Sequence, residues 1–346
     1  MMLISKSGCV FLFYDMGMRI HQKGANMKII FVRHAEPFYD TDTLTDKGKR
    51  EAALLAERAR DWQITQAYAS PLGRAQDTAL PTLKADGIRL ECHYPTPAAD
   101  VIKDPDPKVC LVYPWLREFS IPINSDMHPM NARVPWDYPP YYLSEHPELY
   151  DPKTWFSSSI YRSFSVHAST LDGVEAELTP EVRTIYGQYF KRDPRKTYIQ
   201  QEYEWVCGRF DQVLAQWGYH RDGLHYRTRG NALPTDLNIK SDAHTVSRIE
   251  KQEAAMEAKG VEEPVLVFFC HLGIASILIS HLINTTPAVM QQGFFLPTSS
   301  VTIFSSEERI PGQALFRCQV AGDTSHLRDG DELTSFYGSY SMPFQG

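Results

Sequence analysis

The chain has 346 residues, 43% of them hydrophobic, which is enough for a full apolar core in one large domain or two ordinary ones. Its formal net charge of -7 argues against a general nucleic-acid surface, which is usually basic, and no stretch approaches the roughly 18 consecutive apolar residues of a membrane span. The six cysteines are scattered, without C-x-x-C spacing or a histidine cluster, so we expect reduced thiols in a cytoplasmic protein.

The folded chain is expected to begin at Met27. Residues 1–26 contain a short apolar run that is cut off by Asp15 and lacks the small-residue cleavage site of a secretory signal. We interpret residues 1–26 as a poorly ordered leader.

The first predicted strand ends in two residues that could carry chemistry. A continuous apolar run extends from Lys28 to Val32 and predicts a strand that is buried on both faces of a sheet. Arg33 and His34 follow at its carboxyl end. In open α/β sheets the crevice beyond the carboxyl ends of the strands binds ligands, so we expect the functional site there.

Strands and helices are expected to alternate in the chain after His34. The expected elements are a helix over 49–60, a strand over 66–70, a second helix after Ser70 and a strand over 89–94. Thr45 is the expected N-cap of the first helix. Ser70 is the expected N-cap of the second helix, which carries Arg74 in its first turn.

The middle third of the chain differs in composition. Prolines and aromatic residues are frequent over 121–151, which predicts irregular chain held by ring packing. Apolar residues at helical spacing predict a helix over 198–217, and a polar helix is expected over 247–259. We interpret residues 121–260 as a cap inserted into the core, with Arg133 as a candidate contact to the substrate.

The last third resumes the core pattern. The expected elements are a strand over 264–270, a helix from Leu272 to near Asn284, and strands over 300–304 and 314–320. His271 stands at the end of the first of these strands, as His34 does earlier in the chain. Asp323 to His326 predicts a solvated turn, with His326 as an alternative contact at the rim of the site.

Alternating strands and helices in both outer thirds predict an α/β fold. We expect a three-layer, doubly wound architecture with a mostly parallel sheet flanked by helices and a large inserted cap. The core would comprise residues 27–120 and 261–325, the cap residues 121–260, and a C-terminal tail residues 326–346.

Two cations and two imidazoles are expected to converge on one edge of this sheet. His34 and His271 each end an apolar strand, Arg33 precedes His34, and Arg74 opens the helix after another strand. Guanidinium groups present paired donors to phosphate oxygens, and the amino end of the helix after His271 adds backbone donors. The pattern therefore predicts a phosphate pocket.

These residues lie in motifs that resemble those of the histidine phosphatase superfamily, which has the phosphoglycerate-mutase-like fold. That family has Arg-His-Gly-Glu after its first strand, where this chain has Arg33-His34-Ala35-Glu36. The other matching segments are Leu44-Thr45-Asp46-Lys47-Gly48, Ser70 to Ala79, Leu116-Arg117-Glu118 and the late strand that ends in His271. Order and spacing agree over about residues 27–120 and 262–325.

The resemblance implies a metal-independent phosphomonoesterase that needs no cofactor. His34 would attack phosphorus and form a phosphohistidine, and Glu118 would protonate the leaving group and then activate water. Arg33, Arg74 and His271 would bind the phosphoryl oxygens. The expected substrate is a small phosphorylated metabolite, such as a sugar phosphate. Further candidate contacts to it are Thr45, Leu272, Arg133 and His326.

Alternatives remain open at this point. Ala35 stands where glycine is usual, and Leu272 precedes Gly273, which leaves room for a non-catalytic module that binds a phosphorylated ligand. A phosphoglycerate-mutase-type phosphomutase is the other alternative, although the family's mutase segment has no match after Ala35. Glu118 could instead be an ion-pair partner of Arg117. The oligomeric state is left open.

Overall fold

The computed structural model describes residues 26–91, 101–119, 138–158, 195–196, 198–229, 263–339 and 341–345. The predicted leader before residue 26, the predicted helix over 247–259 and Arg133 lie outside these described residues. Within them, no helix combines the length and the apolar character that crossing a membrane requires.

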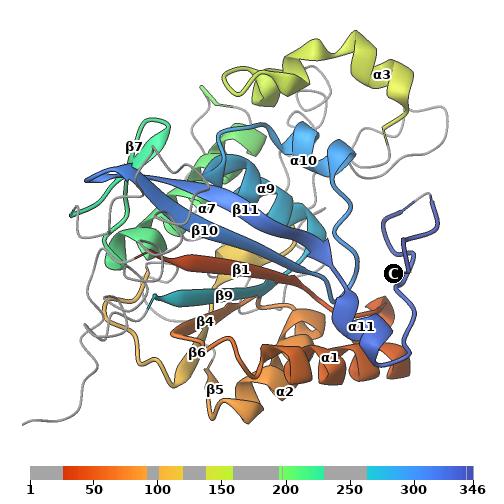
Figure 1. Ribbon diagram of the computed structural model, residues 1–346. Helices are drawn as coiled ribbons and strands as arrows, with labels where there is room; N and C mark the ends of the chain where they lie inside the picture. The colour runs from red at the N-terminus through yellow and green to blue at the C-terminus, as the bar shows by residue number, and fades with distance from the viewer. Residues whose placement is uncertain are drawn as a thin grey trace, which may run out of the picture.

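A nine-stranded mixed sheet forms the centre of the fold, in the order β5-β6-β4-β9-β1-β10-β11-β8-β7 (Figure 1). Its strands are β1 (Lys28–Arg33), β4 (Gln66–Ala69), β5 (Arg89–Glu91), β6 (Val109–Val112), β7 (His220–Asp222), β8 (His225–Arg227), β9 (Val265–Cys270), β10 (Val301–Ile310) and β11 (Gln313–Asp323). Neighbouring strands from β5 to β1 pair in parallel. Neighbouring strands from β1 to β7 pair antiparallel. The predicted doubly wound unit is therefore the parallel half of this larger sheet.

Helices cover both faces of the sheet, which confirms the predicted three-layer α/β fold. The covering helices are α1 (Asp46–Ala59), α2 (Gly73–Ala85), α7 (Tyr198–Gln216) and α9 (Leu272–Leu282). Side chains alternate along β1, as a strand that is buried on both faces requires. Ile30 and Val32 share a core cluster with Leu55 of α1, whereas Phe31 belongs to the cluster that contains Phe210 of α7.

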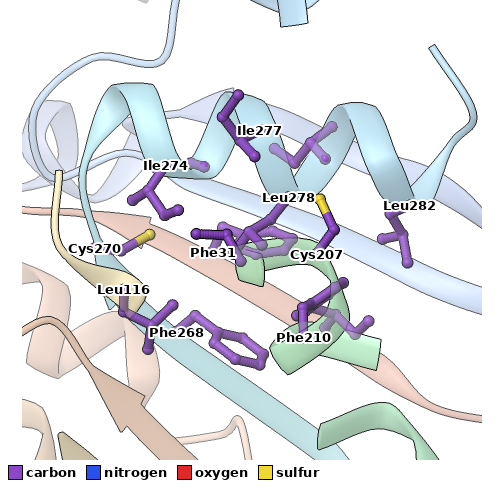
Figure 2. Packing of buried hydrophobic residues seen from close by; sticks show 14 of the residues in the cluster. Phe31, Leu116, Cys207, Phe210, Phe268, Cys270, Ile274, Ile277, Leu278 and Leu282 are labelled. Carbon is purple, nitrogen blue, oxygen red and sulfur yellow. The ribbon is translucent and has the colours of Figure 1, made fainter. Parts of the chain in front are cut away.

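The helix α7 is part of the core layer, although it lies inside the segment predicted as a cap. Figure 2 shows Phe210 of α7 in the same buried cluster as Phe31, Phe268 and the α9 residue Leu278. The ring centroid of Phe210 lies 6.1 Å from that of Phe31 and 5.6 Å from that of Phe268. The helical periodicity of 198–217 therefore serves to cover the sheet. The wider division into core, cap and tail stays a prediction.

The strand β6 was not predicted from the sequence. Its four apolar residues lie between an aspartate-rich loop and Pro114, and so short a run cannot be assigned by periodicity. In the structure β6 fills the place between β4 and β5 and leads directly to the segment that carries Glu118. The remaining short elements are β2 (Pro37–Phe38), η1 (Tyr39–Thr41), β3 (Thr43–Leu44), η2 (Pro114–Leu116), α3 (Pro140–Glu145), η5 (Pro147–Tyr150), η6 (Trp155–Ser157), α10 (Pro287–Gly293) and α11 (Ser325–Asp329).

Candidate active site

The parallel strands β1, β4 and β9 end at the same edge of the sheet. Their register pairs Arg33 with Cys270, which brings the residues that follow, His34 and His271, side by side. The ring centroids of these two histidines lie 5.2 Å apart. Arg74 follows β4 at the start of α2. The predicted convergence of cations and imidazoles is therefore present.

His34 is buried, and its main chain sets the direction of its ring. Nδ1 lies 2.8 Å from the carbonyl oxygen of Ala35, so Nδ1 donates and Nε2 keeps its lone pair. Burial, together with the charges of Arg33 and Arg74, lowers the pKa of His34 well below its usual range. His34 is thus a neutral imidazole whose Nε2 can act as a nucleophile.

Ala35 occupies the position at which the resemblance leads us to expect glycine. Its φ is not positive, so the Cβ of alanine introduces no strain there. The Ala35 N–H donates to Oγ1 of Thr78 over 2.9 Å, and that hydroxyl donates to the carbonyl oxygen of Arg74 over 2.7 Å. Alanine is therefore compatible with the backbone that holds His34.

Main-chain carbonyl groups anchor Arg33. Its Nη1 donates to the carbonyl oxygens of Leu296, over 2.7 Å, and Tyr337, over 3.0 Å. Its Nε is buried and has no hydrogen-bond partner among the described residues. Burial lowers the pKa of Arg33, but a guanidinium stays charged in proteins. Arg33 is thus a fixed cation whose buried Nε–H is available to a ligand.

Arg74 is held by a carboxylate that no sequence motif marks. Its Nη1 lies 2.5 Å from Oδ1 of Asp42, and Oδ2 of Asp42 accepts the N–H of Gly73 over 2.6 Å. The Cζ of Arg74 lies 5.3 Å from the ring centroid of Tyr39. Within the described ranges, Nε of Arg74 is buried and without a hydrogen-bond partner. Asp42 therefore orients Arg74 from the loop after β1.

His271 is fully buried and contacts Ser70. Its Nε2 forms a 2.6 Å hydrogen bond with the Ser70 hydroxyl, while its Nδ1 has no partner in the described part of the chain. Burial, and then the charge of Arg74, lower the pKa of His271 well below its usual range. The prediction that Ser70 caps α2 is wrong, because α2 begins at Gly73 and the Ser70 hydroxyl instead accepts the N–H of Leu72.

Glu118 lies at the amino end of α9. Its Oε1 accepts the N–H of Ile274 over 3.1 Å, and its charge acts on Arg33. Arg117 forms a buried ion pair with Glu202 of α7 and donates to the carbonyl oxygen of Glu118 over 2.9 Å. Arg117 thus pairs with the carboxylate of Glu202. The Glu118 carboxyl group is instead directed to the edge of the sheet that carries Arg33.

Gly273 leaves the space in which the Glu118 carboxyl group lies. A Cβ at this position would stand 2.5 Å from Oε1 of Glu118 and 2.7 Å from the carbonyl oxygen of Phe119. We expect Gly273→Ala to displace Glu118 and to lower kcat/KM about 10-fold to 100-fold, because catalysis is sensitive to shifts of about 1 Å. In the matched control Gly208→Ala no atom lies within 4 Å of the new Cβ. Equal steady-state kinetics for the two variants would contradict this assignment.

Two further candidate residues lie close to these groups. Thr45 is the predicted N-cap of α1, since its Oγ1 accepts the N–H of Gly48 over 3.0 Å. The same hydroxyl donates to the Glu36 carboxylate over 2.9 Å. Leu272 is buried as the first residue of α9. Contacts of Thr45 and Leu272 with a substrate stay a prediction.

His326 is buried in α11, so the prediction of a solvated turn is wrong. Arg58 of α1 pairs with Asp323 over 2.6 Å and donates to Nδ1 of His326 over 3.3 Å, which draws the chain after β11 onto α1. Nε2 of His326 lies 3.2 Å from the hydroxyl of Ser299, whose N–H donates to the carbonyl oxygen of His34 over 3.0 Å. Burial lowers the pKa of His326 to about 4. His326 is thus linked through Ser299 to the main chain of His34.

Glu51 is a buried carboxyl group that the pattern of α1 could have revealed. It falls on the same helical face as Ala52 and Leu55, where an apolar residue is expected. Its Oε2 accepts the N–H of Glu36 over 2.8 Å. Burial raises the pKa of Glu51 to about 7.

We expect the protein to lose stability as the pH rises from about 5 to about 7, because Glu51 must then ionise while buried. Its folded pKa exceeds that of the unfolded chain, so its contribution is full at low pH and is lost as the pH passes the folded pKa. A shift of this size corresponds to about 3 kcal/mol. Urea unfolding at several pH values should show a flatter profile for Glu51→Gln than for the exposed control Glu57→Gln. The same slope in both would contradict this expectation.

The site holds three buried nitrogen atoms that have no hydrogen-bond partner among the described residues, namely Nε of Arg33, Nε of Arg74 and Nδ1 of His271, which is a donor when the Ser70 hydroxyl donates to Nε2. An unmet buried donor costs about 1 to 3 kcal/mol, so proteins rarely keep one that no ligand or water satisfies. Two of these nitrogen atoms belong to guanidinium groups, whose charges both act on His34 and His271. The arrangement therefore suits a tetrahedral anion beside His34.

Comparisons with known proteins agree with this arrangement in part of the chain. Residues 29–94 match the sequence model of the histidine phosphatase superfamily (branch 1). No curated protein matches the chain.

Solved structures show distant likenesses. A mycobacterial glucosyl-3-phosphoglycerate phosphatase is 14% identical, with 86% of this chain and 99% of that chain covered and a TM-score of 0.39. A phosphoglycerate mutase from Bacillus anthracis str. Sterne is 14% identical, with coverages of 90% and 99% and a TM-score of 0.35. A phosphoserine phosphatase mutant from Entamoeba histolytica is 16% identical, with coverages of 87% and 99% and a TM-score of 0.35.

The matched segment carries three of the site residues: Arg33, His34 and Arg74. Glu118 and His271 lie outside the matched segment. The pairing of β1 with β9 brings His271 beside His34, and the hydrogen bond from Ile274 of α9 holds Glu118 near them. The match over residues 29–94 confirms the resemblance of this chain to the histidine phosphatase superfamily.

Proposed function

We propose that the protein is a metal-independent phosphatase that hydrolyses a small phosphorylated metabolite through a phosphohistidine. The observation that carries this proposal is the set of three buried nitrogen atoms without partners among the described residues, on Arg33, Arg74 and His271, around the neutral imidazole of His34. A phosphoryl group placed among these nitrogen atoms would satisfy them and bring phosphorus to Nε2.

In the first step Nε2 of His34 attacks phosphorus, and the bond from phosphorus to the ester oxygen breaks. Glu118 in its acid form gives its proton to the departing oxygen. In the second step water attacks the phosphohistidine, Glu118 takes a proton from that water, and the bond from phosphorus to nitrogen breaks. Inorganic phosphate leaves, and both His34 and Glu118 return to their starting states.

The fixed cations stabilise the charge that develops on the phosphoryl oxygens. Arg33 and Arg74 are held by groups outside the reaction, the carbonyl of Leu296 and the carboxylate of Asp42 among them, so little reorganisation is needed as the bonds change. Nδ1 of His271 adds a neutral donor, because the Ser70 hydroxyl can give its proton to Nε2. Each charge-assisted bond contributes about 1.5 to 3 kcal/mol.

Hydrolysis of an aryl phosphate in the presence of EDTA tests the proposal. We expect turnover that survives the chelator, and a panel of phosphorylated metabolites should then rank the natural leaving groups. Phosphate binding without turnover would instead indicate a non-catalytic binding module. Transfer of phosphate between the positions of phosphoglycerate, faster than its release, would indicate a mutase.

A further inference from the structure

The chain after α11 returns to the mouth of the site. We call residues 333–338 the C-terminal strap, which lies on the outer side of α11 at the right of Figure 1. Its Tyr337 accepts a 3.0 Å hydrogen bond from Nη1 of Arg33 through its carbonyl oxygen. Its Ser335 donates to the carboxylate of Glu36, two residues after His34. The strap thus contacts the last residue of β1 and the segment that follows it.

The strap also fixes the orientation of the Arg33 guanidinium. Both contacts of Nη1 are with carbonyl oxygens, of Leu296 on one side and Tyr337 on the other. With Nη1 so engaged, the edge that bears Nε is left for a ligand, and Nε is a buried donor without a partner among the described residues. The carbonyl of Tyr337 thus adds a second anchor to that of Leu296.

We propose that the C-terminal strap is a wall of the phosphate site and that Tyr337 is a positioning residue for Arg33. The inference rests on the proposed phosphate site and adds a part of the chain that no motif covers. Phosphate affinity would then depend on an intact strap, although the strap itself need not touch the phosphate.

Gly338 shows how closely the strap approaches the site. Its φ is +86°, and a Cβ there would lie 3.2 Å from Cδ2 of Leu272 and 3.6 Å from Nη1 of Arg33. Only glycine adopts this φ and allows this close approach to Leu272 without strain. A side chain at residue 338 should therefore lift Tyr337 away from Arg33.

The ring of Tyr337 is connected to the second arginine of the site, Arg74, through the ring of Tyr39. It lies 6.0 Å from the ring centroid of Tyr39, at an angle of 67°. Tyr39 in turn lies under the guanidinium of Arg74, at 5.3 Å. The strap is thus connected to both arginines, to one through its main chain and to the other through paired aromatic rings.

The strap adds little to the apolar core, so we expect the protein to fold without it. Leu333 is 65% exposed and Phe336 52% exposed. A pocket of about 490 Å³ lies between the strap and the side chains of Glu36 and Lys47. The apolar clusters that support the sheet contain no residue of the strap.

The experiment measures inorganic phosphate binding by calorimetry, together with kcat and KM for an aryl phosphate. It compares the full chain, a chain that ends at Glu332, Gly338→Val and Gly312→Val. Gly312 has the same φ of +86° in the turn between β10 and β11, so its variant carries similar backbone strain away from the site. We expect the truncation and Gly338→Val to raise the phosphate Kd about 10-fold or more, as loss of one charge-assisted bond predicts, and Gly312→Val to leave it unchanged.

The outcomes separate this inference from the proposed function. Phosphate binding by the full chain with an unchanged Kd after truncation would overturn the role of the strap alone. A full chain that neither binds phosphate nor hydrolyses the ester would overturn the proposed function and this inference with it. If the truncated chain does not fold, Gly338→Val against Gly312→Val decides, because equal Kd values for these two would overturn the positioning role.

Discussion

Replacing His34 with alanine is expected to abolish turnover, with a loss of at least about 10,000-fold in kcat. The reason is that covalent catalysis requires the Nε2 lone pair, and His271, the neighbouring imidazole, has its Nε2 bonded to the Ser70 hydroxyl. Phosphate binding should survive the change, since the donors of Arg33 and Arg74 are held by other groups. His34→Ala therefore separates binding from chemistry.

Trapping of the intermediate checks this prediction directly. The full chain is mixed with substrate and quenched in alkaline denaturant, because phosphohistidine is labile in acid, and intact mass then shows whether one phosphoryl group has been added. His220→Ala on the exposed strand β7 is the matched control and should label and turn over normally. Labelling of the His34→Ala chain would show that a different residue is the nucleophile.

The sequence predicted the parts of the site that lie where strands end. A wholly apolar run that stops at a charged or imidazole side chain is a local pattern, and β1 with His34 and β9 with His271 both follow it. Arg74 was recognised in the same way, because the helix after β4 begins close to it. The alternation of these elements sufficed for the three-layer fold.

The parts that were missed are set by contacts between distant segments. Asp42 reaches Arg74 across a loop, and Tyr337 reaches Arg33 from more than 300 residues later in the chain. In the second case the contact uses a main-chain carbonyl, for which no residue type is a signal. His326 was misjudged for a similar reason, since its burial depends on Arg58 in α1.

Glu202→Gln is expected to destabilise the protein by about 3 to 5 kcal/mol, the largest effect on stability that the described contacts predict. Arg117, in the segment after β6, forms an ion pair with Glu202 of α7, and each side chain is only 6% exposed. Removing the carboxylate takes the charged partner away from the buried Arg117 cation. Because Arg117 precedes Glu118 and its charge acts on His271, the variant should also lose activity at temperatures where it is still folded.

Glu204→Gln provides the matched control for this change. Glu204 lies on the same helix and pairs with Lys196, but its side chain is 43% exposed, and such pairs contribute at most about 1 kcal/mol. Urea unfolding should therefore separate the two variants by several kcal/mol, and similar midpoints would contradict the prediction. The double variant Arg117→Met and Glu202→Leu should recover most of the stability, because apolar side chains of similar volume replace both members of the buried pair. Its activity should stay low if Arg117 also holds Glu118 in place, which would show that the buried pair supports the site as well as the fold.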